Sequence, residues 1–564
     1  MKFSNIEYKR PDIDEFKTQF KNLLSDFDSA GSFEVQDGIM KEINEIRKEF
    51  QTMSTLANIR YSINTLDKQF EEEQRFFDIY SPVYDGLLND YYNSIIRSKF
   101  KKQLSEKWGE QLFEIAALII KTYKHEILED LQKENSLRTE YTKLLASAKV
   151  NFDGKELNLA GITPYTESTD RSVRKLANEA KWDFFESNSE QFDRIYDELV
   201  KLRHKMALKL GFKNFIEMGY ARMGRTDYNA EMVAMFREQV RKYIVPLTVK
   251  LKQTQKSLLG IDSFMYYDQP IDFKEGNAKP QGEPEWIVSC AKKMYEELSP
   301  ETGKFFNFMV DNELMDLVTK KGKDTGGYCT FIEKYKSPFI FSNFNGTKGD
   351  IEVLTHEAGH AFQAFQSRFF EIPEYFFPTS EACEIHSMSM EFLTWPWMEH
   401  FFKEQTDKFK YSHLKGSVIF LPYGVSVDEF QHFVYGNPDA SPSQRKQAWL
   451  DIEKKYLPYI DYDENDFLQK GGRWQQQRHI YLMPFYYIDY CLAQICAFQF
   501  WKKSHEDRGK ALKDYIRLCS AGGSKSFLKL VELANLESPF GENGVKPVIS
   551  DIENWLNNVK VVNN

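Results

Sequence analysis

The sequence predicts a mainly α-helical protein, and three features of the 564-residue chain support that prediction. Apolar residues recur every three or four positions over residues 39–59, which is the stripe of an amphipathic helix. Similar spacing continues through most of the chain. Proline, which breaks helix interiors, is absent from residues 83–163 and from 165–245, and this leaves room for long helices.

Three segments interrupt the helical pattern. The first surrounds Asp153-Gly154, a dipeptide typical of tight turns, and predicts a turn or hairpin over residues 151–159. We place a boundary here, between an amino-terminal helical lobe (1–150) and the rest of the chain (151–564). Residues 267–284 are rich in Pro and Gly and predict a surface loop. Residues 326–332 and 338–344 are rich in aromatic and β-branched residues, and predict a small sheet.

Composition argues against several classes of protein. Acidic residues outnumber basic ones by 84 to 74 and no long basic run occurs, so nucleic acid is not an expected partner. The amino terminus becomes charged before an apolar signal segment develops, and no apolar stretch approaches the roughly 20 residues of a membrane span. The six cysteines are sparse and form no Cys-x-x-Cys pair, which favours reduced thiols and a cytoplasmic location.

The strongest chemical signal is His356-Glu357-Ala358-Gly359-His360. On a helix, two histidines four residues apart project from one face and can hold a single metal ion. Glu357 is offset by one residue, where it can act on a metal-bound water as a general base without coordinating the metal. Asp350 is a candidate N-cap for this helix. The competing interpretation, two unrelated histidines on a helix, is less favoured because the chain has only ten histidines.

A catalytic zinc usually takes three protein ligands and leaves one position open. Residues 378–391 begin with helix-initiating residues, and then offer four candidates for the third ligand: Glu381, Glu384, His386 and Glu391. Composition alone does not choose among them.

At this point the chain resembles the M3 metallopeptidases, which comprise the thimet-type oligopeptidases and the oligoendopeptidase F group. In that family a second helix follows the motif helix and carries two glutamates seven residues apart, of which the first is the zinc ligand. Glu384 and Glu391 match this pattern, which makes Glu384 the expected ligand. Cys383 and His386 are then expected to be packing residues.

The resemblance extends over residues 150–500. Asp170-Arg171-Ser172-Val173-Arg174 is similar to a segment of the oligoendopeptidase F group, and residues 338–347 are similar to the strand that leads into the zinc helix. A further segment, residues 473–497, resembles the one that faces the substrate in the family. Its matching residues are His479, Tyr486, Tyr487 and Tyr490.

The resemblance implies two helical lobes that enclose a deep substrate channel, with one zinc ion at its base, held within residues 350–391. It also implies hydrolysis of internal bonds in short unfolded peptides by a Glu357-activated water. Tyr487 and Tyr490, one helical turn apart, are expected to face the zinc and stabilise the oxyanion, while Tyr486 should point elsewhere if the segment is helical.

Two questions stay open from the sequence. Either Glu352 or Glu391 could orient a metal-binding histidine through its second ring nitrogen. The same zinc motif also fits a helical metallocarboxypeptidase or a catalytically silent peptide-binding protein. No oligomeric state is predicted.

Overall fold

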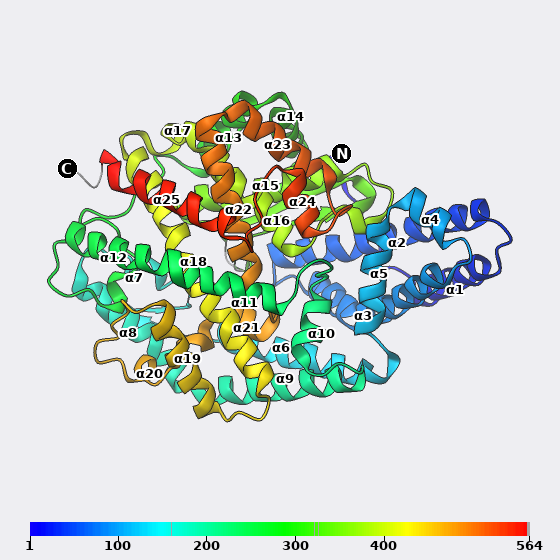
Figure 1. The fold of residues 1–564 in the computed structure, drawn as a ribbon, viewed down its shortest axis with the longest axis horizontal. Coiled ribbons are helices and arrows are strands. Elements are labelled where there is room, and N and C mark those ends of the chain that lie inside the picture. The colour runs from blue at the N-terminus through cyan, green and yellow to red at the C-terminus, as the bar shows by residue number, and fades with distance from the viewer. Residues whose placement is uncertain (160, 321, 325, 561–564) are drawn as a thin grey trace.

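The computed structural model describes residues 1–159, 161–320, 322–324 and 326–560, and it is built mainly from helices, as predicted (Figure 1). The first five helices pack on one another and form the arm at the right of Figure 1. They are α1 (Ile13–Ser29), α2 (Phe33–Ile63), α3 (Lys68–Arg97), α4 (Lys101–Trp108) and α5 (Glu110–Thr122). The apolar stripe over residues 39–59 lies within α2, and its members are buried or partly buried.

The next helices are distributed over the rest of the molecule in Figure 1, from its lower edge to its top. They are α6 (Leu128–Ala146), α7 (Thr163–Thr166), α8 (Arg171–Ser187), α9 (Ser189–Lys209), α10 (Phe215–Arg222), α11 (Ala230–Gln239), α12 (Val245–Leu259), α13 (Pro284–Leu298) and α14 (Pro300–Asp311). Helix α6 packs against α9. The division of the chain at residue 150 stays a prediction.

The second half of the chain carries the central helices. They are α15 (Gly349–Ser367), α16 (Ser380–Leu393), α17 (Glu399–Phe402), α18 (Thr406–Gly436), α19 (Pro442–Tyr456), α20 (Asp466–Gln469), α21 (Arg478–Leu482), α22 (Tyr487–Glu506), α23 (Arg508–Ala521), α24 (Phe527–Leu533) and α25 (Glu542–Asn558). Helix α16 packs against both α15 and α22, so these three helices form the centre of this half of the chain.

The predicted hairpin is present as β1 (Val150–Phe152) and β2 (Lys155–Leu157), which pair antiparallel. Asp153 and Gly154 join them with φ angles of 51° and 70°. Two consecutive left-handed residues are what a type I′ turn requires, and this explains the Asp-Gly sequence.

The predicted surface loop is irregular, but it is more buried than expected. Ile271, Phe273 and Ala278 are buried, because the segment between Asp268 and α13 lies against neighbouring elements instead of projecting into water. Asp268 is fully buried and receives hydrogen bonds from Arg171 and Arg174, the two arginines of the Asp-Arg-x-Val-Arg segment.

A small sheet lies beside α15, as predicted, but it has three strands in the order β3-β5-β4. Strands β4 (Tyr328–Ile332) and β5 (Ser337–Phe344) are the two predicted strands and pair antiparallel. Strand β3 (Met315–Val318) was not predicted and runs parallel to β5, with Met315 opposite Ile340. Strand β5 leads into α15, so the sheet fixes where the motif helix begins.

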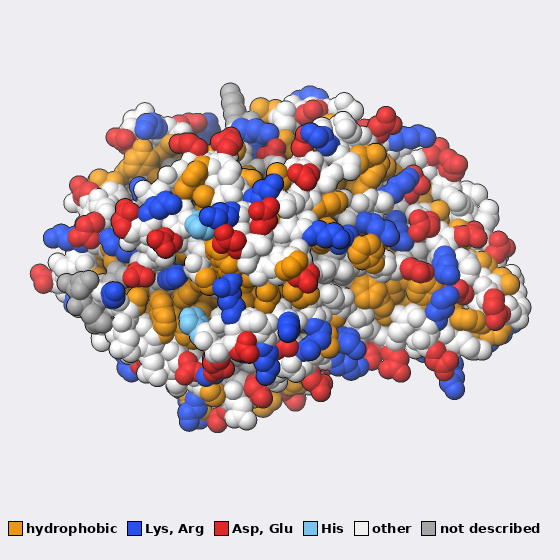
Figure 2. Space-filling view, turned by 90° about the horizontal axis from the view of Figure 1, so that it is seen from above, with side chains coloured by type: hydrophobic (Ala, Val, Ile, Leu, Met, Phe, Trp, Pro, Cys, Tyr) orange, Lys and Arg blue, Asp and Glu red, His pale blue; other side chains and the backbone are white. Residues whose placement is uncertain are grey.

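The surface carries charges of both signs. Figure 2 shows acidic and basic side chains interspersed over one face, with no large basic area. Among the described residues, no helix has the length and apolar character needed to cross a membrane.

Candidate metal centre

Helices α15 and α16 bring three side chains of the motif region together. The Nε2 atoms of His356 and His360 lie 3.3 and 3.5 Å from the same carboxylate oxygen of Glu384, Oε2. One ligand atom from each residue lies within 4.8 Å of the others, the spacing of a candidate metal site. The three side chains therefore direct their metal-binding atoms toward one point.

The start of α15 differs from the prediction for Asp350. The helix begins at Gly349, and Asp350 therefore lies inside its first turn and is not the N-cap. Its carboxylate accepts hydrogen bonds from the backbone N–H groups of Asn345 and Gly346, at 2.9 and 2.8 Å. Asp350 thus fastens the loop between β5 and α15.

Gly359 sets the distance between the two ligand-bearing helices. A Cβ atom at this position would lie 2.6 Å from the carbonyl oxygen of His386 and from the Cα of Ser387. Real Cβ atoms do not approach backbone this closely, so only glycine lets α16 pack this near α15. The hydroxyl of Tyr515, on α23, donates to the same carbonyl of His386 at 2.8 Å and so also holds α16 in place.

Of the two carboxylates considered as partners of a metal-binding histidine, Glu391 is the one that contacts it. Its Oε1 lies 2.7 Å from Nδ1 of His356, and its Oε2 lies 2.6 Å from Nε2 of His413. Glu352 instead pairs with Lys348 at 2.6 Å. His413 comes from α18 and was not identified from the sequence, because a lone histidine in a long helix carries no motif.

Glu357 lies beside the cluster with its side chain buried. Its Oε2 atom has no hydrogen-bond partner among the described residues. Burial raises the pKa of the Glu357 carboxyl, and the nearby charges of Glu384 and Glu391 raise it further, although His356 and His360 act in the opposite direction. An unpartnered buried carboxylate oxygen is costly unless another group completes the site.

The predicted substrate-facing segment reaches the cluster, but through a different tyrosine than expected. The hydroxyl of Tyr486 donates to Oε1 of Glu384 at 2.8 Å. The prediction that Tyr486 points elsewhere was wrong because Tyr486 precedes α22 and is its N-cap residue. Phe485, just before it, has a φ of 66°, so the chain turns there and the helical spacing rule does not apply.

His479, Tyr487 and Tyr490 lie close together. The His479 ring centroid is 5.0 Å from that of Tyr487 and 5.8 Å from that of Tyr490. Burial raises the pKa of both phenols. The charges of Glu384 and Glu357 raise that of Tyr490 further, whereas Tyr487 is influenced mainly by Tyr423 and Cys491. Tyr490 therefore responds to the charges of the cluster more than Tyr487 does.

A buried ion pair that sequence reasoning missed holds this segment. Arg225 donates to the carbonyl oxygen of Phe485 at 2.5 Å and to Asp489 at 2.6 Å, and both charged side chains are fully buried. Because removing one partner of such a pair leaves an uncompensated charge, the turn before Tyr486 is strongly fixed.

A cavity of about 430 Å³ adjoins the cluster. His479, Tyr487 and Tyr490 line one side, and Glu391 and Met388 from α16 line another. Phe420 and Gly416 from α18 are also part of its wall. This space lies next to Glu391 and the tyrosines, where a bound chain would contact them.

The electrostatics of the cluster favour a cation. Burial alone would lower the pKa of His356, but the hydrogen bonds with Glu384 and Glu391 raise it well above its usual value. Burial would raise the pKa of Glu384, but the two histidines hold it well below its usual range. Two imidazole nitrogens and one carboxylate oxygen are also the donor set of many catalytic zinc sites. The residues therefore fit a zinc ion.

Comparison with known proteins decides the family. A family model described as Peptidase family M3 matches residues 164–547, and one described as the Peptidase M3 N-terminal domain matches residues 3–123. The chain belongs to peptidase family M3. The resemblance seen in the sequence is thereby confirmed.

Individual relatives agree with this assignment. A solved structure described as Pz peptidase A with an inhibitor is 57% identical, covers 100% of both chains and has a TM-score of 0.97. The oligoendopeptidase F homologue of Mycoplasma genitalium is 19% identical and covers 97% of this chain and 90% of its own length. A homologue of the same name from Borreliella burgdorferi is 23% identical over 74% of this chain and 72% of its own.

Proposed function

We propose that this M3 peptidase is a zinc-dependent oligoendopeptidase that hydrolyses internal bonds of short unfolded peptides. One zinc ion per chain would be held by His356, His360 and Glu384. The observation that carries the proposal is the convergence of these three donor atoms beside the unpartnered Oε2 of Glu357. The membership of family M3 and the similarity to oligoendopeptidase F homologues support the same activity.

The zinc would polarise the scissile carbonyl and acidify the attacking water. Glu357 takes the proton from that water and later delivers it to the leaving amine, so no covalent enzyme intermediate is required.

The substrate-facing segment supplies the remaining polar groups. Tyr486 and Tyr490 lie on the side of Glu384, and their rings are 5.2 Å apart. A phenol is a neutral hydrogen-bond donor, so either hydroxyl can stabilise the negative charge that develops on the carbonyl oxygen. His479 packs against both rings, and the amide of Gln477 lies 2.9 Å from its Nδ1. It is placed to orient the tyrosines and to contact the substrate.

The test is product analysis on a peptide blocked at both ends, with wild-type enzyme and Glu357→Gln. We expect cleavage at internal bonds by the wild type, and a turnover lower by about 10² to 10⁴-fold in Glu357→Gln with its zinc retained. An intact blocked peptide alongside trimming of unblocked peptides would favour a carboxypeptidase. Absence of any hydrolysis would favour a silent peptide-binding protein.

A further inference from the structure

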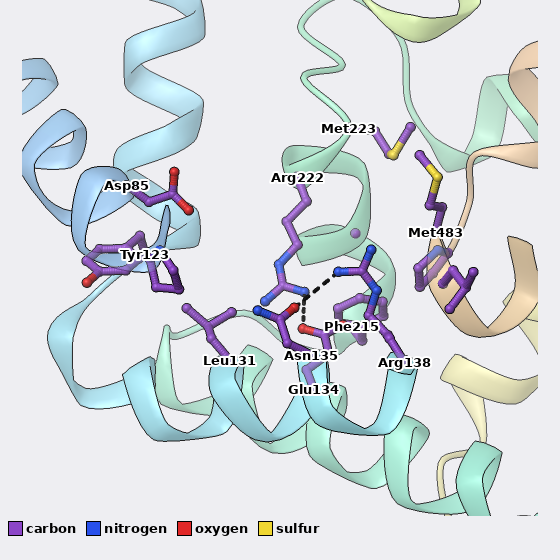
Figure 3. A pocket seen from close by; sticks show the side chains of 14 residues that line it. Asp85, Tyr123, Leu131, Glu134, Asn135, Arg138, Phe215, Arg222, Met223 and Met483 are labelled. Carbon is purple, nitrogen blue, oxygen red and sulfur yellow. Dashed lines mark hydrogen bonds and ion pairs between the residues drawn. The ribbon is translucent and has the colours of Figure 1, made fainter. Parts of the chain in front are cut away.

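A second cavity, of about 270 Å³, lies outside the metal cluster (Figure 3). Its walls come from α3, α6 and α10 and from residues 482–484. Small-molecule sites usually measure roughly 300–1,000 Å³, so this space suits one end of a ligand better than a whole one. Its apolar lining includes Leu131, Phe215, Met223 and Met483.

One wall of the cavity carries more positive than negative charge. Glu134 accepts from Arg203 at 2.6 Å and from Arg222 at 3.0 Å, so one carboxylate serves two guanidinium groups. Arg203 is fully buried and also donates to the hydroxyl of Tyr435 and the carbonyl oxygen of Tyr481. The single negative charge of Glu134 is thus shared between two arginines. Part of the positive charge of Arg222, which lines the cavity, is therefore left uncompensated.

Arg138, one turn after Glu134 on α6, adds a further charge. It donates to the neutral side chain of Asn135 at 3.2 Å, and its buried Nε has no hydrogen-bond partner among the described residues. The charge of Glu134 acts on Arg138, but among the described residues the ion pairs of Glu134 are with Arg203 and Arg222. In Figure 3 the guanidinium groups of Arg138 and Arg222 approach each other from opposite directions. Guanidinium groups with free donors bind carboxylates in paired hydrogen bonds.

Asp85 is the other carboxylate that lines this cavity, and it belongs to α3 on the facing wall. Burial raises its pKa to about 6. It forms no ion pair with Arg138 or Arg222 among the described residues.

The cavity is close to the proposed catalytic residues along the chain. Helix α21 contains His479, and the next residues, 482–484, form the cavity wall before the chain reaches Tyr486. The Cα atoms of Met483 and Tyr486 are three residues apart and so at most about 11 Å from each other. The segment that forms this cavity wall therefore continues directly into the residues that carry Tyr486.

We propose that Arg138 and Arg222 bind the terminal carboxylate of the substrate peptide, while the apolar lining receives its last side chain. The inference rests on the proposed peptidase function, because that function makes the occupant a peptide. Every substrate peptide with a free carboxyl end can bring a carboxylate to the cavity, whatever its amino-acid sequence. An acidic side chain has the same chemistry, and the experiment separates the two.

The experiment compares kcat/KM for two peptides of one sequence, with a free carboxylate or a carboxamide at the carboxyl end. We expect the wild type to prefer the free acid by about tenfold or more, the scale of a hydrogen bond to a charged group. Arg138→Gln should slow cleavage of the acid alone and so remove the preference, while Arg138→Lys should keep part of it. Lys133→Gln is the matched control, since Lys133 lies on the same helix with its side chain 59% exposed.

Equal rates for acid and amide in the wild type would overturn the proposal, as would an equal loss for both peptides in Arg138→Gln. A carboxamide peptide ending in glutamate that is cleaved as fast as the free acid would also overturn it, in favour of side-chain recognition. Fluorescence anisotropy with the same labelled peptides measures binding without cleavage. If only the free acid binds and Arg138→Gln abolishes that binding, the carboxylate site is supported even if neither peptide is hydrolysed. Failure of the carboxylate site and failure of the proposed peptidase function therefore give different results.

Discussion

His356 is held on both sides of its ring. Nε2 points toward Glu384, and Nδ1 lies 2.7 Å from Glu391, which also contacts His413 on α18. A carboxylate that accepts from Nδ1 fixes the ring orientation and increases the basicity of the nitrogen that faces the metal. The Glu391 side chain, on α16, therefore connects α15 and α18 through its contacts with the two histidines.

This arrangement predicts an effect of Glu391→Gln on metal affinity. The loss of such an orienting carboxylate typically lowers metal affinity by about 10- to 100-fold, measured by competition with a chelator. The matched control is Glu352→Gln, because Glu352 lies on the same helix as His356 but pairs with Lys348. Equal zinc affinities for Glu391→Gln and Glu352→Gln would contradict a positioning role for Glu391.

The positions of the three tyrosines predict that their Phe variants differ in kcat. Tyr486→Phe and Tyr490→Phe remove hydroxyls near Glu384, and loss of one oxyanion donor typically costs about 10² to 10³ in kcat. Tyr487→Phe should have the smallest effect, because the Tyr487 ring packs against Tyr423 and the charges of Glu384 and Glu357 are not among the main influences on its pKa. The measurement is kcat together with zinc content. Near wild-type kcat in both Tyr486→Phe and Tyr490→Phe would show that this segment does not stabilise the transition state.

The spacing of residues along the sequence predicted which site residues lie together only where they belong to one helix. The approach of His356 to His360 follows from their four-residue separation, and the family pattern indicated Glu384. The orientation of Tyr486 could not be read from spacing, since it depends on the left-handed conformation of Phe485 and on its contact with Arg225. The contribution of His413 depends on how α18 packs against α16, which no local pattern encodes.

At the scale of elements, the close packing of α15 on α16 brings Glu384 to the histidines. Gly359→Ala would place a methyl group 2.6 Å from the backbone of α16. Overpacking of this kind costs about 1–3 kcal/mol of unfolding free energy, and a shift of α16 should also weaken zinc binding. Chemical denaturation and zinc titration of the variant measure the two effects.

Gly38→Ala is the control, since Gly38 lies inside helix α2 and a Cβ there would have no neighbour within 4 Å. Alanine favours helix over glycine, so this change should stabilise the protein by up to about 1 kcal/mol. Unchanged stability and zinc affinity in Gly359→Ala would show that the two helices can separate without consequence.

The elements were predicted where their patterns are long or regular. The stripe of α2 and the Asp-Gly turn of the β1–β2 hairpin are of this kind. Strand β3 was missed because its four residues, Met315–Val318, show no alternation and depend on a parallel partner distant in sequence. The segment after Asp268 was predicted to be exposed because Pro and Gly indicate irregular backbone but not its burial.

At the scale of the whole molecule, the amino-terminal helices are fastened to the catalytic region by buried polar contacts. Arg47 on α2 lies 2.6 Å from Glu374, and Tyr92 on α3 donates to the same carboxylate oxygen at 2.5 Å. Burial alone would raise the pKa of Glu374, but the charge of Arg47 lowers it below its usual value. Arg47 and Tyr92 lie 327 and 282 positions from Glu374, so only the fold reveals the pairing.

The cavity with Arg138 and Arg222 belongs to the same junction, since α3 contributes one of its walls. An enclosed channel between the amino-terminal helices and the catalytic region remains a proposal. It would explain why a peptidase of this family acts on short flexible chains, because a folded protein could not reach a metal site between two packed groups of helices.

The central claim is that a single zinc ion on His356, His360 and Glu384 is required for hydrolysis of internal peptide bonds. The most direct measurement is zinc titration of the metal-free enzyme, with hydrolysis of a doubly blocked peptide as the readout. The control for Glu384→Gln is Glu381→Gln, because burial and the charge of Asp489 raise the pKa of Glu381 to about 8 and glutamine resembles its neutral form. We predict that activity rises to a plateau at one zinc per chain in the wild type and in Glu381→Gln, and that Glu384→Gln neither retains zinc nor recovers. Full hydrolysis without zinc, or stoichiometric zinc retained by Glu384→Gln, would contradict the assignment.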